Sequence, residues 1–322
     1  MNSRIRVGIT IGDPSGIGPA MAVKALARAK DSADFIIIGD SWVLDRAREK
    51  LGQRSKAKGQ RVEVADLQNV NRKSFRFGRV KAEYGRASIE YLGAALELIR
   101  RREIDCLVTG PISKEAVNAA GYKYAGHTDF FAARLRAKPV MMLLNERLKI
   151  SLVTRHIPLK EVSARLSAQE FSRVATATHA ALKKLFLIRR PRIAACGVNP
   201  HASDNGLIGS EENAILAPAI KALKKRAVAV EGPLSADVAL HRAYSGEFDA
   251  VIAAYHDQAL IPLKLSSNRS GINLTLGLPF IRTSPLHGTA FDLAARPDLA
   301  DPGSMIAALK LAVQCASQLK RD

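Results

Sequence analysis

Short apolar runs recur along this chain at intervals that leave room for helices between them, and they constrain the fold more than any other feature. Apolar runs of this length are typical of strands buried on both faces. The predicted strands cover residues 5–11, 35–40, 104–108, 139–144, 149–153, 192–196 and 249–254. Because strands that alternate with helices usually pair in parallel, the sequence predicts an α/β protein with largely parallel sheets flanked by helices.

Helical segments are predicted between and after these runs. Apolar residues within 89–99 follow helical spacing, and a Ser-x-x-Glu capping box at 167–170 precedes a second apolar helical face. Further helices are expected over 20–29 and about 304–319, while the polar stretch 50–80 predicts an excursion or a hairpin. No repeat or linker is evident, so we expect any division into domains to be discontinuous.

The chain is strongly basic, with 49 Lys and Arg against 30 Asp and Glu, a formal net charge of +19 over 322 residues. Such a balance raises the hypothesis of nucleic-acid binding. The basic residues form only short runs at predicted helix ends, where the helix dipole favours cations. We therefore favour a solvated surface that attracts anionic substrates, with no nucleic-acid partner.

Three cysteines, Cys106, Cys196 and Cys315, lie far apart in apolar contexts. This usage favours free thiols in a reducing compartment over a disulfide framework. The chain shows no signal peptide and no apolar stretch of membrane length. We expect a cytoplasmic enzyme with no membrane partner.

Three of the seven histidines, His156, His201 and His256, each come shortly after the end of a predicted strand. In open α/β sheets, ligands bind beyond the carboxyl ends of the strands. Three neutral imidazoles gathered there would form an open metal site with room for substrate or water. The sequence therefore predicts a divalent metal site, with zinc the first choice and magnesium or cobalt as alternatives.

Two loop segments are ambiguous by themselves. The glycine-rich turn at 12–19 lacks the spacing of a dinucleotide fingerprint and the Lys-Ser/Thr of a P-loop. An anion site and a plain tight turn are about equally supported there. The pair His127 and Thr128 can donate hydrogen bonds to a phosphate or carboxylate, but a helix N-cap by Thr128 or Asp129 is the simpler interpretation.

Polar residues also follow His256 in an otherwise apolar part of the chain. Lys264, Asn273 and Arg282 are set among apolar neighbours, and buried charges are rare unless they are paired or bind a ligand. This pattern predicts a pocket for an acidic substrate beside the candidate metal site.

Five segments together resemble the 4-hydroxythreonine-4-phosphate dehydrogenase family of pyridoxine biosynthesis. They are GDPSGIGP at 12–19, GHT at 126–128, NPHA at 199–202, YHDQ at 255–258 and GLPFIRTS at 277–284. The resemblance implies the two-domain isocitrate/isopropylmalate dehydrogenase-like fold, with the active site in the interdomain cleft. It also implies NAD or NADP, a divalent metal, and a homodimer whose active site is shared between subunits.

The resemblance implies roles for particular parts of this chain. The nucleotide-binding-type domain is expected at about 1–110 plus 255–322, and the metal, substrate and dimerisation domain at 111–254. The expected site residues are, for the metal, His156, His201 and His256; for the substrate, His127, Thr128, Lys264, Asn273 and Arg282; for catalysis, Lys264, His256 and Asp257; and for the cofactor, Gly277, Leu278, Pro279, His287, Gly288 and Thr289. His156 and His201 are expected from one subunit and His256 from the other.

The implied reaction is the metal-dependent, NAD(P)-linked oxidation of 4-phosphooxy-L-threonine to a 3-keto acid. That product decarboxylates to 3-amino-2-oxopropyl phosphate on the route to pyridoxal 5'-phosphate. Alternatives are a related dehydrogenase of D-threonate or D-erythronate 4-phosphate, or of a cis-dihydrodiol carboxylate. A non-catalytic nucleic-acid-binding protein is a remote alternative, because the site residues are intact. Ala20, Arg155 and the loop at 202–206 depart from the usual family pattern, which leaves the exact substrate open.

Overall fold

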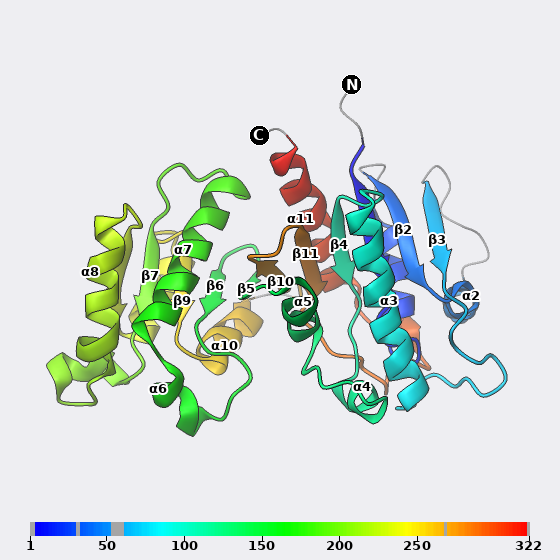
Figure 1. Ribbon diagram of the computed structural model, residues 1–322, viewed down its shortest axis with the longest axis horizontal. Coiled ribbons are helices and arrows are strands. Elements are labelled where there is room, and N and C mark those ends of the chain that lie inside the picture. The colour runs from blue at the N-terminus through cyan, green and yellow to red at the C-terminus, as the bar shows by residue number, and fades with distance from the viewer. Residues whose placement is uncertain (1–3, 30–32, 53–60, 267–268, 321–322) are drawn as a thin grey trace. The chain divides into compact units, whose positions relative to one another are not determined.

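The computed structural model describes residues 4–29, 33–52, 61–266 and 269–320 of the chain. These fall into two compact units, one of Met1–Lys138 with Leu278–Asp322 and the other of Pro139–Gly277. We call them unit 1 and unit 2. Both are built from strands flanked by helices, which confirms the predicted α/β class (Figure 1).

Unit 1 contains a wholly parallel set of strands in the order β3-β2-β1-β4-β11. The strands are β1 (Arg6–Thr10), β2 (Asp34–Gly39), β3 (Val62–Asp66), β4 (Cys106–Thr109) and β11 (Ile281–Pro285). The helices are α1 (Gly18–Leu26), α2 (Ser41–Lys50), α3 (Ala82–Arg100), α4 (Lys114–Ala119), α5 (His127–Leu135), η4 (Pro297–Leu299) and α11 (Gly303–Leu319). Helix α3 packs against β1 and β2, and α11 packs against β4 and β11.

The polar stretch 50–80 is predicted to form an excursion or a hairpin, and its described part does not form a hairpin. Strand β3 pairs in parallel with β2, with Ile37 opposite Val64, so the connection between them is a crossover. Residues 53–60 lie outside the described residues. A parallel pairing has no local sequence signal comparable to a two-residue hairpin turn, and the prediction of a hairpin was therefore wrong.

Unit 2 contains strands in the order β10-β5-β6-β9-β7-β8. They are β5 (Val140–Leu144), β6 (Lys149–Leu152), β7 (Ile193–Cys196), β8 (Val230–Leu234), β9 (Ala250–Ala253) and β10 (Ile272–Leu276). The helices are η1 (Leu159–Glu161), α6 (Val162–Arg165), α7 (Ala168–Lys184), η2 (Pro200–Gly206), η3 (Glu212–Leu216), α8 (Ala217–Lys225), α9 (Ala236–Tyr244) and α10 (His256–Ser266). Strand β5 runs antiparallel to both β10 and β6, and the remaining pairs are parallel.

The predicted start of the helix after Ser167 and the predicted free cysteines are confirmed. The Ser167 hydroxyl accepts a hydrogen bond from the Glu170 N–H at 3.2 Å, which is one of the two bonds of a capping box, and α7 begins directly after Ser167. The Glu170 carboxylate also accepts from Arg173 Nε at 2.8 Å. All three cysteines are buried and free. Among the described helices, none combines the length and apolar character needed to cross a membrane.

The two compact units meet along the chain at 138/139 and at 277/278, later than the expected crossings after residues 110 and 254. Helix α4 packs on α3, which keeps the segment after β4 in unit 1. Helix α10 packs against β5, β6 and β9, which keeps it in unit 2. The assignment of a nucleotide-binding-type domain and a metal and dimerisation domain stays a prediction.

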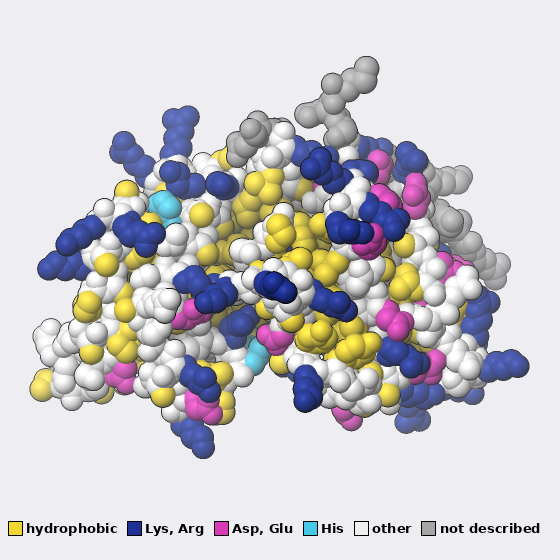
Figure 2. All heavy atoms as spheres, in the orientation of Figure 1, with side chains coloured by type: hydrophobic (Ala, Val, Ile, Leu, Met, Phe, Trp, Pro, Cys, Tyr) yellow, Lys and Arg dark blue, Asp and Glu magenta, His cyan; other side chains and the backbone are white. Residues whose placement is uncertain are grey.

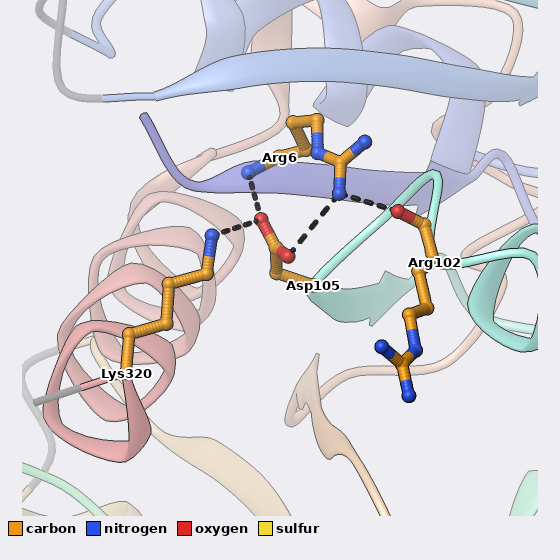
Figure 3. Close-up of polar contacts among 4 residues, drawn as sticks. All are labelled: Arg6, Arg102, Asp105 and Lys320. Carbon is orange, nitrogen blue, oxygen red and sulfur yellow. Dashed lines mark hydrogen bonds and ion pairs between the residues drawn. The ribbon is translucent and has the colours of Figure 1, made fainter. Parts of the chain in front are cut away.

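An ion cluster at the amino ends of β1 and β4 ties the last helix to the sheet of unit 1 (Figure 3). Asp105 accepts hydrogen bonds from the Arg6 N–H at 2.7 Å and from Lys320 Nζ at 2.9 Å, and the Arg6 guanidinium also donates to the Arg102 carbonyl oxygen. Partial burial opposes ionisation of Asp105, but these donors together lower its pKa below the ordinary value.

Lys and Arg side chains are scattered over the visible face, with Asp and Glu between several of them (Figure 2). Several Lys and Arg side chains of the described residues form short-range ion pairs, such as Arg100 and Arg101 with Glu97 of α3. Exposed pairs of this kind contribute little to stability. The charge on this face is therefore spread over the surface and does not form a single basic stripe.

Candidate active site

The predicted site residues divide between the two units. Unit 1 carries His127, Thr128, Leu278, Pro279, Arg282, His287, Gly288 and Thr289, and unit 2 carries His156, His201, His256, Asp257, Lys264, Asn273 and Gly277. Each unit brings some of its own members together.

In unit 1, a buried arginine lies at the end of strand β4. Arg282, the second residue of β11, is 1% exposed, and its Nε and Nη2 lie 3.1 and 2.5 Å from the Thr109 hydroxyl oxygen. Burial lowers the pKa of Arg282 to about 9, which still leaves it protonated at neutral pH. A buried guanidinium at a strand end is suited to binding a phosphate or carboxylate.

His127 lies close enough to Arg282 to feel its charge. Desolvation first, and then the positive charge of Arg282, holds the pKa of His127 well below its ordinary value, so the ring is neutral. Its Nε2 lies 3.0 Å from the Gly110 carbonyl oxygen. Because a carbonyl oxygen can only accept, Nε2 carries the proton, and Nδ1 is left as a hydrogen-bond acceptor.

Helix α5 begins at His127, so the expected cap assignment was wrong. The N-cap is Gly126, with extended backbone and no side-chain cap bond, and both Thr128 and Asp129 lie inside the first turn. Glycine can occupy the N-cap without a capping side chain. The consequence is that Thr128, which is 7% exposed, sits among the free N–H groups of a helix start, where anions are favoured.

The glycine-rich turn at 12–19 packs tightly against neighbouring loops of unit 1. Gly12 has a φ of +74°, and a Cβ there would lie 2.3 Å from the Pro111 carbonyl oxygen, so a larger residue is excluded. Asp13 is fully buried, and its Oδ1 accepts from the Ser15 N–H at 2.9 Å. Burial raises the pKa of Asp13 to about 7 despite hydrogen bonds from the Ser15 and Gly16 N–H groups.

The same turn holds the predicted cofactor loop in place. The Ile17 N–H donates to the Thr289 carbonyl oxygen at 2.8 Å. A Cβ at Gly16 would lie only 3.0 Å from that oxygen, so the absence of a side chain at Gly16 permits this close approach of the two backbones. His287 Nδ1 lies 3.0 Å from the Gly288 carbonyl oxygen, and its buried Nε2 has no hydrogen-bond partner among the described residues. The loop is therefore anchored by its backbone and retains an unused ring nitrogen.

In unit 2, two of the three candidate metal ligands are neighbours within one chain. Strands β6 and β9 pair in parallel with Leu152 opposite Ala253, so the residues that follow them leave the same edge of the sheet. The His156 and His256 ring centroids are 5.2 Å apart. This pairing differs from the expected one, in which His156 goes with His201 and His256 comes from the partner subunit.

Asp257 orients the ring of His256. The His256 Nδ1 lies 2.6 Å from Asp257 Oδ1. A carboxylate at Nδ1 holds the proton on that nitrogen and leaves Nε2 free to bind a metal, which is the usual arrangement behind a histidine ligand. Asp257 therefore acts on the ring of its neighbour, and its expected catalytic role stays a prediction.

His201 lies in a separate loop. It is exposed, and the backbone of residues 201–205 has positive φ throughout, between 45° and 68°. Residues other than glycine rarely adopt this conformation. Among the described residues, no group of three or more His, Cys, Asp or Glu side chains is arranged to hold a metal ion. The predicted three-histidine set is thus not assembled within the described part of this chain.

The remaining predicted residues of unit 2 are dispersed. Lys264 is exposed on α10, about 12 Å along the helix axis from His256 at 1.5 Å per residue, and is not enclosed by the apolar run around it. Asn273, on β10, is half-buried, and its Oδ1 has no partner among the described residues. Gly277 has a φ of +79° in the turn that leads to β11.

Sequence reasoning missed three buried polar residues that organise these groups. Thr109 holds Arg282, Asp13 lies in the glycine-rich turn, and Glu212 holds the loop before His201. Thr109 and Asp13 do lie in segments that the sequence singles out as a strand end and a turn. Nothing local distinguishes Glu212 from an exposed residue of an acidic pair.

The comparisons with known proteins agree on one family. The family described as "Pyridoxal phosphate biosynthetic protein PdxA" matches residues 31–312. A 4-hydroxythreonine-4-phosphate dehydrogenase of a Sulfurihydrogenibium species is 40% identical, over 96% of this chain and 98% of that protein. A D-threonate 4-phosphate dehydrogenase of Cupriavidus necator is 38% identical, over 97% of each.

A solved structure gives the same result at the level of the fold. The crystal structure of 4-hydroxythreonine-4-phosphate dehydrogenase from Klebsiella pneumoniae has a TM-score of 0.86 and 34% identity, over 98% of this chain and 99% of that one. The family match spans residues 31–312, and the relatives and this structure cover 96–98% of the chain. The chain belongs to the PdxA family of pyridoxal phosphate biosynthetic proteins.

Proposed function

We propose that this chain oxidises 4-phosphooxy-L-threonine with NAD or NADP in a metal-dependent reaction. The 3-keto acid would then decarboxylate to 3-amino-2-oxopropyl phosphate, in the biosynthesis of pyridoxal 5'-phosphate. The proposal is carried by one observation in particular, the buried Arg282 beside the neutral His127 and the start of α5, in a chain of this family. That group is suited to a substrate with an anionic end.

The substrate anion would be held by the residues of unit 1. Arg282 offers a guanidinium that stays protonated despite burial, and the first turn of α5 offers N–H groups around Thr128. His127 contributes differently from the simple expectation of a donor, because its Nδ1 can only accept. It would accept from a substrate hydroxyl or ammonium group, next to the anion that Arg282 binds.

The histidines of unit 2 fit a divalent metal. Two imidazoles on one tetrahedral metal, each about 2 Å from it, have ring centroids roughly 5 Å apart. The 5.2 Å separation of His156 and His256 agrees with that geometry, and Asp257 leaves the Nε2 atom of His256 available. Nitrogen ligands favour zinc, and magnesium or cobalt remain alternatives.

A divalent cation held there would supply Lewis acidity. It would lower the pKa of the substrate hydroxyl, and it would polarise the ketone so that decarboxylation is easier. The nicotinamide cofactor would supply the hydride acceptor. The chain itself would bind the anionic end with Arg282, hold the proton on His256 Nδ1 with Asp257, and keep the cofactor loop at Thr289 fixed to the turn at 12–19. Lys264 and Asn273 are proposed as further substrate contacts, and Lys264 as a proton-transfer group.

We further propose a homodimer whose metal site is completed by the partner. Because His156 and His256 are neighbours in one chain, we place both on the same subunit and assign His201 to the partner. Mixed dimers of a His156→Ala chain with a His201→Ala chain test this. Our assignment leaves one of the two sites in each mixed dimer intact, so the mixed dimer, separated from the two parent dimers, should have about half of the activity of the unmodified dimer. If His256 came from the partner, or if all three came from one chain, both sites would stay broken.

Related phosphorylated hydroxy acids are the second candidate substrates. The relative from Cupriavidus necator is nearly as similar as the one from Sulfurihydrogenibium, so identity alone does not choose between their substrates. The test is reduction of NAD and NADP, followed by absorbance, with 4-phosphooxy-L-threonine, D-threonate 4-phosphate, D-erythronate 4-phosphate and a cis-dihydrodiol carboxylate. The proposal fails if 4-phosphooxy-L-threonine is not the best substrate, measured as kcat/KM.

The metal requirement has its own test. Exhaustive chelation should abolish turnover, and zinc, cobalt or magnesium should restore it to different extents. Full activity after complete metal removal would contradict the metal role. A cytoplasmic location is also proposed, on the support of three buried free thiols.

A further inference from the structure

Glu212 is a buried carboxyl group that the proposed reaction does not use. It is the first residue of η3 and is 1% exposed, whereas its neighbour Glu211 is only partly buried. A buried carboxyl group is tolerated when hydrogen-bond donors satisfy its oxygens. The identity of those donors shows what Glu212 holds.

All of its partners lie in the segment between β7 and His201. Glu212 Oε1 accepts from the Val198 N–H at 2.7 Å and the Asn199 N–H at 2.8 Å. Its Oε2 accepts from Asn199 Nδ2 at 2.9 Å. One carboxyl group therefore fixes the backbone and the side chain of Asn199, two residues before the candidate metal ligand.

The same segment is tied to the helix that carries His256. Gln258 Nε2 donates to the Gly197 carbonyl oxygen at 2.9 Å, and Gln258 Oε1 accepts from the Ala254 N–H at 2.7 Å. Hydrogen bonds thus run from the end of β9 through Gln258 to Gly197. Glu212 continues this chain of contacts to the start of the loop at 201–205.

The backbone conformation of the loop at 201–205 is unfavourable, so the loop needs contacts such as those of Glu212 to hold it. Its five consecutive residues have left-handed φ values, and such a stretch persists only when surrounding contacts hold it. The Asn199 side chain also packs closely on Gly209, where a Cβ would lie 2.4 Å from Asn199 Nδ2, so this packing needs glycine at position 209. The contacts before the loop are therefore specific, and they determine where His201 is presented.

We propose that Glu212 is a positioning residue for the metal site, which it serves by holding the loop that presents His201. This inference rests on the proposed function, because it needs His201 to bind the metal. A residue that supports a ligand in this way typically changes metal affinity by about 10–100-fold when it is replaced.

The test is zinc affinity of the full-length protein, measured by competition with a chromogenic chelator. Glu212→Gln keeps the shape of the side chain but turns one acceptor into a donor that faces the donors of Asn199. It should weaken zinc binding about 10–100-fold. Glu211→Gln is the matched control, because Glu211 reaches Asn199 only at its side-chain amide, from which Oε2 accepts at 2.8 Å, and its other partners include the Ser210 N–H and the Ser163 side chain. The control should stay within about twofold of the unmodified chain.

A second readout does not depend on the metal. Amide hydrogen exchange of residues 197–206 in the metal-free protein should be faster in Glu212→Gln than in Glu211→Gln. Glu212→Asp, which shortens the side chain, should give an intermediate exchange rate if Glu212→Gln folds poorly. Equal exchange and equal zinc affinity in Glu212→Gln and Glu211→Gln would overturn the inference. If the unmodified chain binds no zinc, the metal proposal fails instead. If Glu212→Gln speeds amide exchange but leaves zinc affinity unchanged, Glu212 is a purely structural anchor, which also overturns the positioning role.

Discussion

Replacing Asp13 by Asn should stabilise this protein above neutral pH, because Asp13 is ionisable in a place that disfavours charge. The side chain is fully buried in the turn at 12–19. Its Oδ1 accepts from the Ser15 N–H, and its Oδ2 has no partner among the described residues. Burial raises the pKa from 3.8 to about 7.

The direction of the pH dependence follows from that shift. The folded pKa lies above the unfolded one, so the folded chain binds the proton more tightly between pH 4 and pH 7. The contribution of Asp13 to stability is complete below about pH 4 and is lost as the pH rises through about 7. A shift of roughly three units corresponds to about 4 kcal/mol at about 1.4 kcal/mol per unit.

Asn removes this titration but does not recover the full amount. Its amide oxygen can still accept from the Ser15 N–H, whereas its amide NH2 replaces an atom that has no partner. A buried donor without a partner costs about 1–3 kcal/mol. We therefore expect a net gain in unfolding free energy of about 1–3 kcal/mol at pH 8 and a loss at pH 4.

Urea unfolding followed by circular dichroism at pH 4, 6 and 8 measures this. The plot of unfolding free energy against pH should be flatter for Asp13→Asn than for the unmodified chain. Asp298→Asn, at an exposed position, is the control and should leave the slope unchanged. If Asp13→Asn reproduces the slope of the unmodified chain, the reasoning from burial is refuted.

Three further predictions use other contacts. Gly85→Ala would place a Cβ 2.1 Å from the Ala116 carbonyl group, so α3 and α4 must separate; urea unfolding should show a loss of about 3 kcal/mol. Lys320→Met should cost about 1 kcal/mol at pH 7 and less at pH 3. The folded-state pKa of Asp105 lies below its ordinary value of 3.8, so its contribution begins to fall below that pH and is lost as the pH passes through the folded-state pKa; equal losses at both pH values would contradict this. Asp257→Asn should weaken zinc binding at least about tenfold with unchanged circular dichroism.

The strands were the most predictable part of the fold. The apolar runs at 104–108, 149–153 and 249–254 correspond to β4, β6 and β9 within a few residues, because a strand buried on both faces must be apolar along its length. Strand direction was not predictable in the same way. Nothing local distinguishes β5, which runs antiparallel to both neighbours, from the parallel strands.

The sequence shows the order of the family motifs, but it does not show which of the candidate site residues are neighbours. Lys264 is exposed on α10, although its apolar neighbours in the sequence suggest an enclosed position. His127 starts a helix and has only an acceptor left on its ring, where the sequence suggests a donor in a loop. Both differences arise from helix geometry and from a carbonyl oxygen of another segment, which spacing along the chain does not reveal.

The sequence by itself determined the apolar runs of seven strands, the start of the helix after Ser167, the free cysteines and the family motifs, but it did not indicate β3, β8, β10 or β11. Each of these depends on local composition or on residues close together in the chain. Only the tertiary structure decided that His156 neighbours His256, because that follows from the pairing of β6 with β9, and that Asp13 and Glu212 are buried. Burial and pairing depend on which distant segments pack together, and these contacts determine the protonation of Asp13 and the placement of the loop that carries His201.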